Sequence, residues 1–336
     1  MALSLLLKED KEEEILNGGN ERYLVFPPDP KYQDLWELYE KHRQAFWVAE
    51  DIDYSADLTD WEKLSNEEKH FVEMILAFFA GSDGLVLENL VQNFFNEVKI
   101  SEARSFYTFQ GAMENIHAHT YALLIHTYIK DDERKNYILN AMDTIPVVTK
   151  KADWAKKWMD PNKHNFGIRL CAFAVVEGVF FSGAFCAIFW LKDRNLLTNG
   201  LGQSNEFIAR DEALHVEFAV ALFHHLKTKP KPNQVHEMVK EAVKLEEEFI
   251  CHAVSCDLIG MDKNLMTQYI HYVSDRLLIQ LGYDKLFNAT NPFLFMDKIG
   301  LDTKSNFFER RVSEYKKVPL RNLDDNHFKI NKDDNF

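Results

Sequence analysis

Two copies of the motif Glu-x-x-His decide the fold of this chain: Glu114-Asn115-Ile116-His117 and Glu212-Ala213-Leu214-His215. Each copy lies in a long stretch with helical periodicity and apolar neighbours. A three-residue step on an α-helix places both side chains on one face, so each motif offers a carboxylate and an imidazole that point the same way. The sequence thus predicts two helices that carry paired, inward-facing ligands.

A third copy of the motif, Glu67 and His70, has a different setting. It lies in the charged run Asn66 to Lys69, which is typical of a solvated helix start. Composition alone produces about one such pair by chance. We therefore interpret this copy as a surface feature.

Two isolated acids, Asp83 and Glu177, lie in equally apolar helical stretches. Leu170 to Leu191 contains Glu177 as its only ionisable carboxylate and is long enough to cross a bilayer, so a membrane helix is one interpretation. The neighbouring helices are amphipathic, however, and a helix that is apolar all round also suits the centre of a large bundle. In that core Glu177 must be protonated, hydrogen-bonded or bound to a cation.

Length and composition indicate one large soluble domain, since 336 residues with 46% hydrophobic content can bury a substantial core. The formal charge of -14 opposes binding to nucleic acid or to an anionic membrane. The cysteines form no Cys-x-x-Cys pair, which favours reduced thiols in a cytoplasmic protein over a zinc site or a disulfide framework. They are Cys171, Cys186, Cys251 and Cys256.

Helical periodicity dominates the chain and alternating strand patterns are scarce, which predicts an all-α bundle. The breaks fall at Pro, Gly, Asn and Asp clusters. The predicted helices run over residues 31–48, 65–96, 101–130, 133–156, 166–193, 203–227, 232–258 and 262–281.

Four carboxylates and two imidazoles on four helices match the ligand set of ferritin-like dimetal bundles, in which two helices give one acid each and two give Glu-x-x-His. Hard oxygen ligands with two imidazoles suit iron or manganese better than zinc, and four carboxylates bring two divalent ions near charge balance. Buried Glu–His pairs that satisfy each other would explain one motif, but not four converging helices. The predicted metal ligands are Asp83, Glu114, His117, Glu177, Glu212 and His215.

The predicted organisation therefore has three parts. Residues 1–26 are expected to be a flexible N-terminal tail. Residues 27–306 would form an all-α, ferritin-like bundle with a dimetal carboxylate site in its core. Residues 307–336 lose the apolar period and are expected to be a flexible C-terminal tail.

Tyr121 gives the predicted metal site a specific chemistry. It lies four residues after His117, on the same helix face and one turn beyond the motif. A tyrosine that only packs in the core is the alternative. Apolar side chains near the other predicted ligands would form a dry cage around this phenol, as a phenoxyl radical requires; they are Phe181, Phe185 and Ile208.

At these residues the chain resembles the small, radical-generating subunit of class I ribonucleotide reductase, in its eukaryotic and viral branch. The resemblance covers about Pro27 to Tyr315. It rests on Phe46-Trp47, Leu76-Ala77-Phe78-Phe79-Ala80-Gly81-Ser82-Asp83-Gly84, Ala112-Met113-Glu114-Asn115-Ile116-His117, Val176-Glu177-Gly178, Arg210-Asp211-Glu212-Ala213-Leu214-His215 and Thr290-Asn291-Pro292-Phe293.

The resemblance implies a cofactor of two iron ions per chain, oxo-bridged and diferric after reaction with O2, with manganese as the less favoured metal. It implies a stable tyrosyl radical on Tyr121 and an electron path from His117 through Asp211 to Trp47. That path would continue over Tyr315 into a large subunit, where ribonucleotides are reduced to deoxyribonucleotides for DNA synthesis. The C-terminal tail would dock on the large subunit, and the small subunit would form a homodimer or a mixed dimer with a paralogue.

Helical geometry supports the role of Asp211 independently. It lies about 100° round the helix from Glu212 and one turn from His215, so it flanks the metal face and could orient a ligand imidazole. A surface ion pair with Arg210 is the alternative. For Trp47 the resemblance alone makes the selection, because other tryptophans, Trp36 and Trp61 among them, could equally be packing residues.

The sequence departs from the family pattern in two places. Ala118-His119-Thr120 stands where the branch has Ser-Glu-Met. His119 should point away from the metal face and is not included among the ligands, whereas Thr120 could alter the hydrogen bonding near Tyr121 and so the lifetime of the radical. The C-terminal segment Phe328 to Phe336 is longer than usual and carries two lysines, which predicts docking with altered contacts.

Two other functions remain open at this point. One is a ferritin-like oxidase that stores iron or hydroxylates a ligand, which would need neither Trp47 nor a tyrosine-bearing tail. The other is a structural paralogue that only stabilises an active small subunit. Such a paralogue would be expected to have lost its ligands, whereas all six are present here.

Overall fold

Helices build the part of the chain that the computed structural model describes, residues 10–18 and 25–296, and no strand occurs within it. The predicted all-α class is confirmed. Chain contacts separate residues 1–296 from residues 297–336. The predicted tail at 307–336, with Tyr315, lies outside the described residues.

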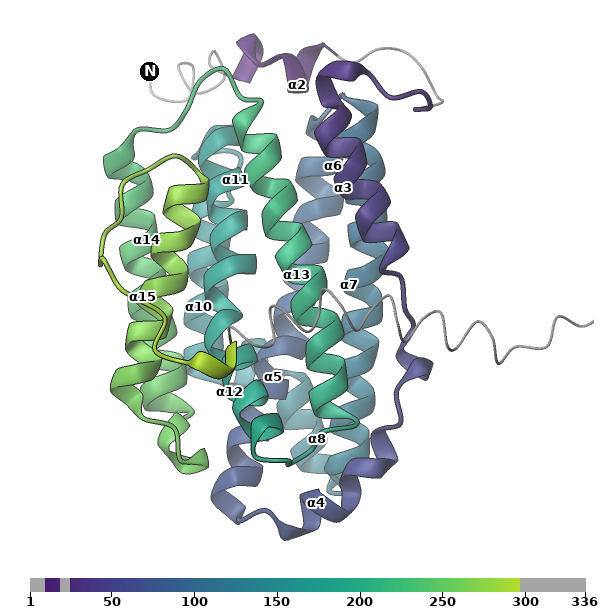
Figure 1. Ribbon diagram of the computed structural model, residues 1–336, viewed down its shortest axis with the longest axis vertical. Coiled ribbons are helices and arrows are strands. Elements are labelled where there is room, and N and C mark those ends of the chain that lie inside the picture. Colours follow the sequence, from purple (N-terminus) through teal and green to yellow (C-terminus); the bar gives the residue numbers. More distant parts are fainter. Residues whose placement is uncertain (1–9, 19–24, 297–336) are drawn as a thin grey trace, which may run out of the picture. The chain divides into compact units, whose positions relative to one another are not determined.

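Long helices lie alongside one another in the unit that ends at Met296 (Figure 1). Helix α13 packs against both α3 and α7, and α7 packs against α5, so the two motif helices share a core. The helices are α2 (Glu14–Asn17), α3 (Gln33–Gln44), α4 (Leu58–Lys63), α5 (Asn66–Asn89), α6 (Phe95–Glu97), α7 (Ser101–Tyr128), α8 (Asp132–Leu139), α9 (Ala141–Thr144), α10 (Pro146–Trp158), α11 (Phe166–Val175), α12 (Ser182–Asp193), α13 (Leu201–His224), α14 (Pro232–Glu247) and α15 (Lys263–Gln280).

Short helical segments of other types connect or interrupt these helices. The 3₁₀ segments are η1 (Pro30–Tyr32), η2 (Ala49–Asp51), η3 (Tyr54–Asp57) and η7 (Cys256–Ile259). The π-helical segments are η4 (Leu90–Phe94), η5 (Val176–Phe180) and η6 (Glu248–Ala253). Segment η5 joins α11 to α12 and contains Glu177, so one predicted metal ligand sits where the helix widens.

The predicted helix over 133–156 is wrong as a single element. The structure has three helices there, α8, α9 and α10. Pro146 explains the last break, because it has no amide hydrogen to donate and its fixed φ suits the first position of a new helix. The other predicted helices are present, several with a short 3₁₀ or π segment at an end or within them.

In the part of the chain that the structure describes, two stretches are long and apolar enough to span a membrane, Asn66–Glu97 and Phe166–Asp193. In the second, 94% of the most apolar window is buried inside the protein, and in the first 61%. The uniformly apolar character of α11 and α12 therefore matches a helix that other helices surround, as the bundle interpretation expects.

Residues 10–18 fall within the predicted N-terminal tail, and in the structure they pack against the bundle. The carboxylate of Glu13 accepts hydrogen bonds from the amides of Lys227 and Thr228, both at 2.7 Å. Ile15 is fully buried and its carbonyl accepts a hydrogen bond from the amide of Lys99 at 2.8 Å. One apolar side chain and one buried acid thus attach this segment to the bundle.

A buried acid, Asp57, ties the end of one motif helix to the start of the other. Its carboxylate accepts hydrogen bonds from the Tyr128 hydroxyl at 2.7 Å and from the amides of Gly200 and Leu201 at 3.0 and 2.8 Å. Those amides begin α13 and have no partner within the helix. A Cβ at Gly200 would lie 2.9 Å from the Asp57 carboxylate, so the close approach requires glycine. These bonds help to hold the ends of α7 and α13 at fixed positions.

Candidate metal centre

The first motif lies on an unbroken stretch of α7, where side chains three and four residues apart share a face. That face carries Gln110, Glu114, His117 and Tyr121, none of which is more than 2% exposed. The second motif lies in the middle of α13 with Glu212 and His215 equally buried. Phe106 of α7 stacks on Phe218 of α13 with ring centroids 3.8 Å apart, which brings the two faces together.

All six predicted ligands converge in two overlapping clusters. One contains Asp83, Glu114 and His117, and the other contains Glu114, Glu177, Glu212 and His215, with the potential ligand atoms of each cluster within 4.8 Å of one another. We call Asp83, Glu114 and His117 the Asp83 half, and Glu177, Glu212 and His215 the Glu177 half.

The distances across the centre show how closely the two halves meet. Nδ1 of His117 is 3.1 Å from Glu212 Oε1 and 3.5 Å from Glu114 Oε2. Nδ1 of His215 is 2.9 Å from Glu212 Oε2 and 3.2 Å from Glu114 Oε1. Both imidazoles therefore present Nδ1 to the same carboxylates, as two ligands of one metal centre would.

Buried polar atoms without hydrogen-bond partners also indicate that these residues fit a metal cluster. Each of the six ligands keeps a buried polar atom without a hydrogen-bond partner among the described residues, which is costly in a dry interior. On five of them the atom faces or belongs to the clustered carboxylates and Nδ1 atoms. These are Asp83 Oδ2, Glu114 Oε2, His117 Nδ1, Glu177 Oε2 and Glu212 Oε1. Divalent cations would use these lone pairs and balance the charge.

Burial and mutual repulsion shift the pKa values of the four clustered acids. Burial and neighbouring carboxylates raise the pKa of Asp83, of Glu114 and of Glu177, most strongly for Asp83 and Glu177. Burial also acts to raise the pKa of Glu212, but His215 and the hydrogen bonds to this carboxylate outweigh it and hold that pKa well below its usual range. Without a metal, Asp83, Glu114 and Glu177 thus hold protons more tightly than free acids do, and cations must displace these protons on binding.

The predicted neighbours of His117 are in contact with it. Nε2 of His117 is 3.1 Å from Asp211 Oδ2, and the same oxygen accepts a hydrogen bond from the indole Nε1 of Trp47 at 2.7 Å. The other oxygen of Asp211 pairs with Arg210 at 3.0 Å. Asp211 is fully buried, so a surface ion pair with Arg210 does not describe it.

Trp61, another tryptophan considered from the sequence, does not take the place of Trp47 beside Asp211. Its ring stacks on Tyr128.

Tyr121 lies in an aromatic environment beside the Asp83 half. Its ring stacks on Phe79 with centroids 4.7 Å apart and planes 8° from parallel. Phe181 and Phe185 pack in turn on the ring of Phe79, with centroid distances of 5.8 and 5.0 Å. Burial, together with the Asp83 carboxylate, raises the pKa of Tyr121 well above its usual value, so the phenol is neutral.

The remaining sequence expectations near Tyr121 can be placed as well. Ile208 is buried on α13, one turn before Glu212. His119 is exposed, in agreement with its exclusion from the ligands. The Thr120 hydroxyl donates a hydrogen bond to the carbonyl of Ile116 at 2.8 Å, so a backbone partner already occupies it.

The third Glu-x-x-His copy lies away from this centre. Glu67 and His70 are exposed near the start of α5, which confirms their interpretation as a surface pair.

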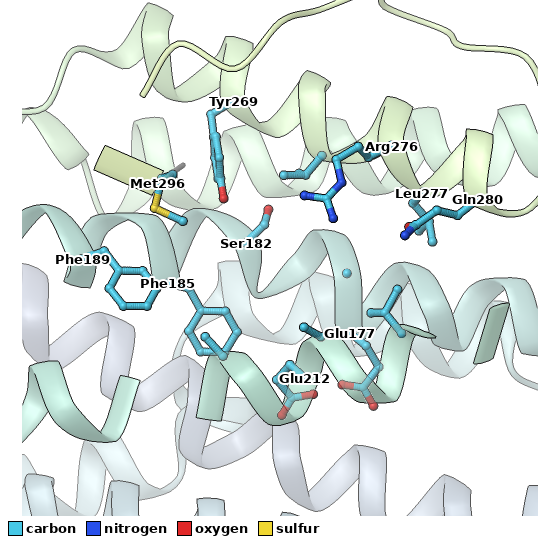
Figure 2. Close-up of a pocket in the computed structure, with 15 residues that line it drawn as sticks. Glu177, Ser182, Phe185, Phe189, Glu212, Tyr269, Arg276, Leu277, Gln280 and Met296 are labelled. Carbon is cyan, nitrogen blue, oxygen red and sulfur yellow. The ribbon is translucent and has the colours of Figure 1, made fainter. Parts of the chain in front are cut away.

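A cavity of about 210 Å³ reaches the Glu177 half. Figure 2 shows Glu177 and Glu212 together on one side of it, with Arg276 and Gln280 on the opposite side. The remaining wall is largely apolar and includes Phe185, and Tyr269 and Ser182 add hydroxyl groups. Small solutes could thus approach this half of the centre.

The π segment that carries Glu177 is stabilised by a buried ion pair. Lys151 of α10 lies 2.5 Å from Glu246 of α14 and donates a second hydrogen bond to the Phe180 carbonyl at 2.8 Å. The other oxygen of Glu246 accepts the Gly183 amide at 3.2 Å. Both backbone groups lie at the junction of η5 with α12, where the change of helical pitch disturbs the regular hydrogen bonding.

Sequence reasoning missed some residues around the site. Gln110 donates to Glu177 at 3.2 Å and lies 3.4 Å from Glu114, so its amide links two acids. Its position one turn before Glu114 was the available signal. Phe79, His42 and Lys151 carry no such signal, because their roles depend on helices that are distant in sequence.

A buried cluster of four carboxylates and two histidines between helices defines a dimetal-carboxylate helical bundle protein. Residues 26–292 match the family model "Ribonucleotide reductase, small chain". The ribonucleoside-diphosphate reductase small chain of Neurospora crassa is 51% identical over 94% of this chain and 77% of that protein. The vaccinia virus (strain Ankara) small chain is 50% identical over 96% and 99%. The Rnr4 homodimer structure from Saccharomyces cerevisiae is 34% identical with a TM-score of 0.80, covering 94% and 96%.

The chain belongs to the ribonucleotide reductase small-chain family. Members of this family are the metal-dependent, radical-generating subunits of an oxidoreductase that reduces ribonucleotides to deoxyribonucleotides, and they work with a large subunit. The family named from the sequence motifs is confirmed.

Proposed function

We propose that the six clustered side chains hold two iron ions, and that Tyr121 is the residue on which the radical is formed. When bound, the iron ions would supply the reduction of O2 that oxidises the phenol. The observation that carries the proposal is the convergence of all six ligands beside a buried tyrosine. Iron is proposed because the family resemblance of the motifs implies it; an oxygen-rich donor set with two imidazoles suits manganese as well.

The protein residues have separable tasks in this proposal. Gln110 keeps Glu114 and Glu177 at a fixed separation through its amide. The rings of Phe79, Phe181 and Phe185, with Ile208, exclude water from the phenol. Oxidation of a neutral phenol releases a proton, and Asp83, the carboxylate with the strongest influence on the pKa of Tyr121, is the proposed acceptor.

One extra electron would reach the centre through Trp47. The indole of Trp47, the carboxylate of Asp211 and the ring of His117 form a continuous hydrogen-bonded series with distances of 2.7 and 3.1 Å. The same series would carry the radical equivalent outward. Tyr315, the proposed next residue, lies outside the described residues.

The proposed partners follow from the family and from the tail sequence. Residues Phe328 to Phe336 would dock on the large subunit, which would hold the ribonucleotide site, and the whole assembly would be cytoplasmic. A homodimer is proposed because the similar yeast Rnr4 structure is a homodimer; a mixed dimer with a paralogue is the other form. Deleting Phe328 to Phe336 should abolish reductase activity and leave iron loading intact.

Iron loading of Glu177→Ala tests the proposed centre. The wild-type chain should bind close to two iron ions, whereas this variant should lose most of its occupancy, because one carboxylate and its negative charge are missing from the cluster. Replacement of the exposed acid Glu217 by glutamine provides the matched control on α13 and should load fully. Full loading of Glu177→Ala would remove that residue from the site, and a loaded but radical-free wild type would favour an iron-storing oxidase.

A further inference from the structure

His42 of α3 is a fully buried imidazole that the proposed function does not use. Neither of its ring nitrogens has a hydrogen-bond partner among the described residues. Its ring lies edge-on to His215 with centroids 4.9 Å apart. The rings of Phe106 and Phe109 surround it at 5.1 and 4.9 Å. A polar ring enclosed by apolar ones needs a partner, and His215 is the polar ring that packs on His42.

His215 also has a ring nitrogen that needs a hydrogen-bond partner. Its Nδ1 faces Glu212 and Glu114, the side on which a metal would bind. Its Nε2 is buried and has no hydrogen-bond partner among the described residues. A metal-bound imidazole normally donates its other N–H to an acceptor, which fixes the tautomer and the ring orientation. For His117 that acceptor is Asp211.

We propose that His42 accepts a hydrogen bond from Nε2–H of His215, directly or through one buried water, and so positions the second histidine ligand. An uncharged imidazole has one acceptor and one donor nitrogen, which suits this task. Because His42 precedes Trp47 by five residues, one short segment backs both histidine ligands. The inference rests on the proposed metal site.

Three variants of the full chain separate this positioning role from packing. His42→Phe keeps the ring and removes the acceptor. His42→Gln restores a polar acceptor of similar reach. Tyr107→Phe is the control, because it removes another buried polar atom that has no hydrogen-bond partner among the described residues, on a ring that packs on Phe94 and Phe218. Mn²⁺ is the probe, and binding to the metal-free protein is followed by paramagnetic resonance of free Mn²⁺.

We expect His42→Phe to weaken Mn²⁺ binding by about 10- to 100-fold, the range seen when the hydrogen-bond partner of a ligand is lost. His42→Gln should recover most of this loss, and Tyr107→Phe should bind as the wild type does. The melting temperature of metal-free His42→Phe should fall, because Nε2–H of His215 loses its acceptor.

A His42→Phe protein that binds Mn²⁺ as tightly as wild type, or that melts at a higher temperature when metal-free, would overturn the inference, since both results mean that His42 is an unpaired packing residue. Equal weakening in His42→Gln and His42→Phe would overturn it as well. Failure of the wild type itself to bind Mn²⁺ would instead contradict the proposed metal site.

Discussion

The two halves of the metal centre contain the same kinds of ligand but are supported differently. In the Asp83 half the ligands lie on the α-helical α5 and α7, and a charged group, Asp211, supports His117 from behind. In the Glu177 half one ligand lies in a π segment, and His215 faces the neutral ring of His42. Burial, followed by the nearby His215, lowers the pKa of His42 to about 3.

The difference indicates separate tasks for two otherwise similar motifs. The Asp83 half is buried, its Asp83 carboxylate raises the pKa of Tyr121, and hydrogen bonds connect His117 through Asp211 to Trp47. The Glu177 half borders the cavity and depends on a helical irregularity that a buried ion pair stabilises. We infer that the first half serves electron transfer and the second serves the entry of small reactants. Environment, rather than the motif itself, assigns these tasks.

The largest loss of stability is expected when the buried ion pair that stabilises the π segment of the Glu177 half is broken. Lys151→Met leaves Glu246 as an uncompensated buried charge, which should lower the free energy of unfolding by about 3–5 kcal/mol. Denaturant titration measures this loss. The double variant Lys151→Met, Glu246→Leu should recover most of the stability, because no charge is then left unpaired.

The control for this loss is Lys157→Met, which breaks an exposed ion pair with Glu241 and should cost less than about 1 kcal/mol. Equal losses in the Lys151 and Lys157 variants would mean that the buried pair contributes nothing specific to the Glu177 half.

A second prediction addresses the hydrogen bonds that connect His117 of the Asp83 half through Asp211 to Trp47. Asp211→Asn keeps the side-chain shape but weakens the acceptor shared by His117 and Trp47. Nucleotide reduction with the large subunit should fall about 100-fold or more, the upper range for loss of a ligand's partner. Steady-state reduction assays give the ratio. Retention of more than half of the activity would show that this series is dispensable.

The smallest effect is expected at the cavity. Ala213 lines it beside Glu212, so Ala213→Phe should obstruct access and slow Fe²⁺ uptake about fivefold, or about 1 kcal/mol in the barrier. The final iron content should be unchanged. Stopped-flow absorbance follows the uptake. Ala112→Phe, at an exposed position on the other motif helix, is the control, and equal rates in both variants would contradict entry by this route.

Much of this site could be predicted from the chain alone, because its signal is local. The three-residue spacing within a helix fixes which side chains share a face, so the ligands on α7 and α13 and the position of Tyr121 follow from the sequence. Asp83 and Glu177 were identifiable because an isolated acid in an apolar helix requires a partner.

Other features could not be predicted because they arise between helices. The contact of His42 with His215 depends on how α3 crosses α13, and the pairing of Lys151 with Glu246 depends on α10 and α14. The π segment at Glu177 has no periodicity signal that separates it from an α-helix. The break at Pro146 could have been predicted, since proline favours the first turn of a helix.

The central claim is that Tyr121 carries the radical. The most direct measurement is the electron paramagnetic resonance spectrum of the protein after metal-free chain is given Fe²⁺ and then O2, for wild type and for Tyr121→Phe. The wild type should show a tyrosyl signal, and the variant should load the same amount of iron and show none, because it lacks only the phenol oxygen. An unchanged tyrosyl signal in Tyr121→Phe would contradict the account and assign the radical to another of the twelve tyrosines.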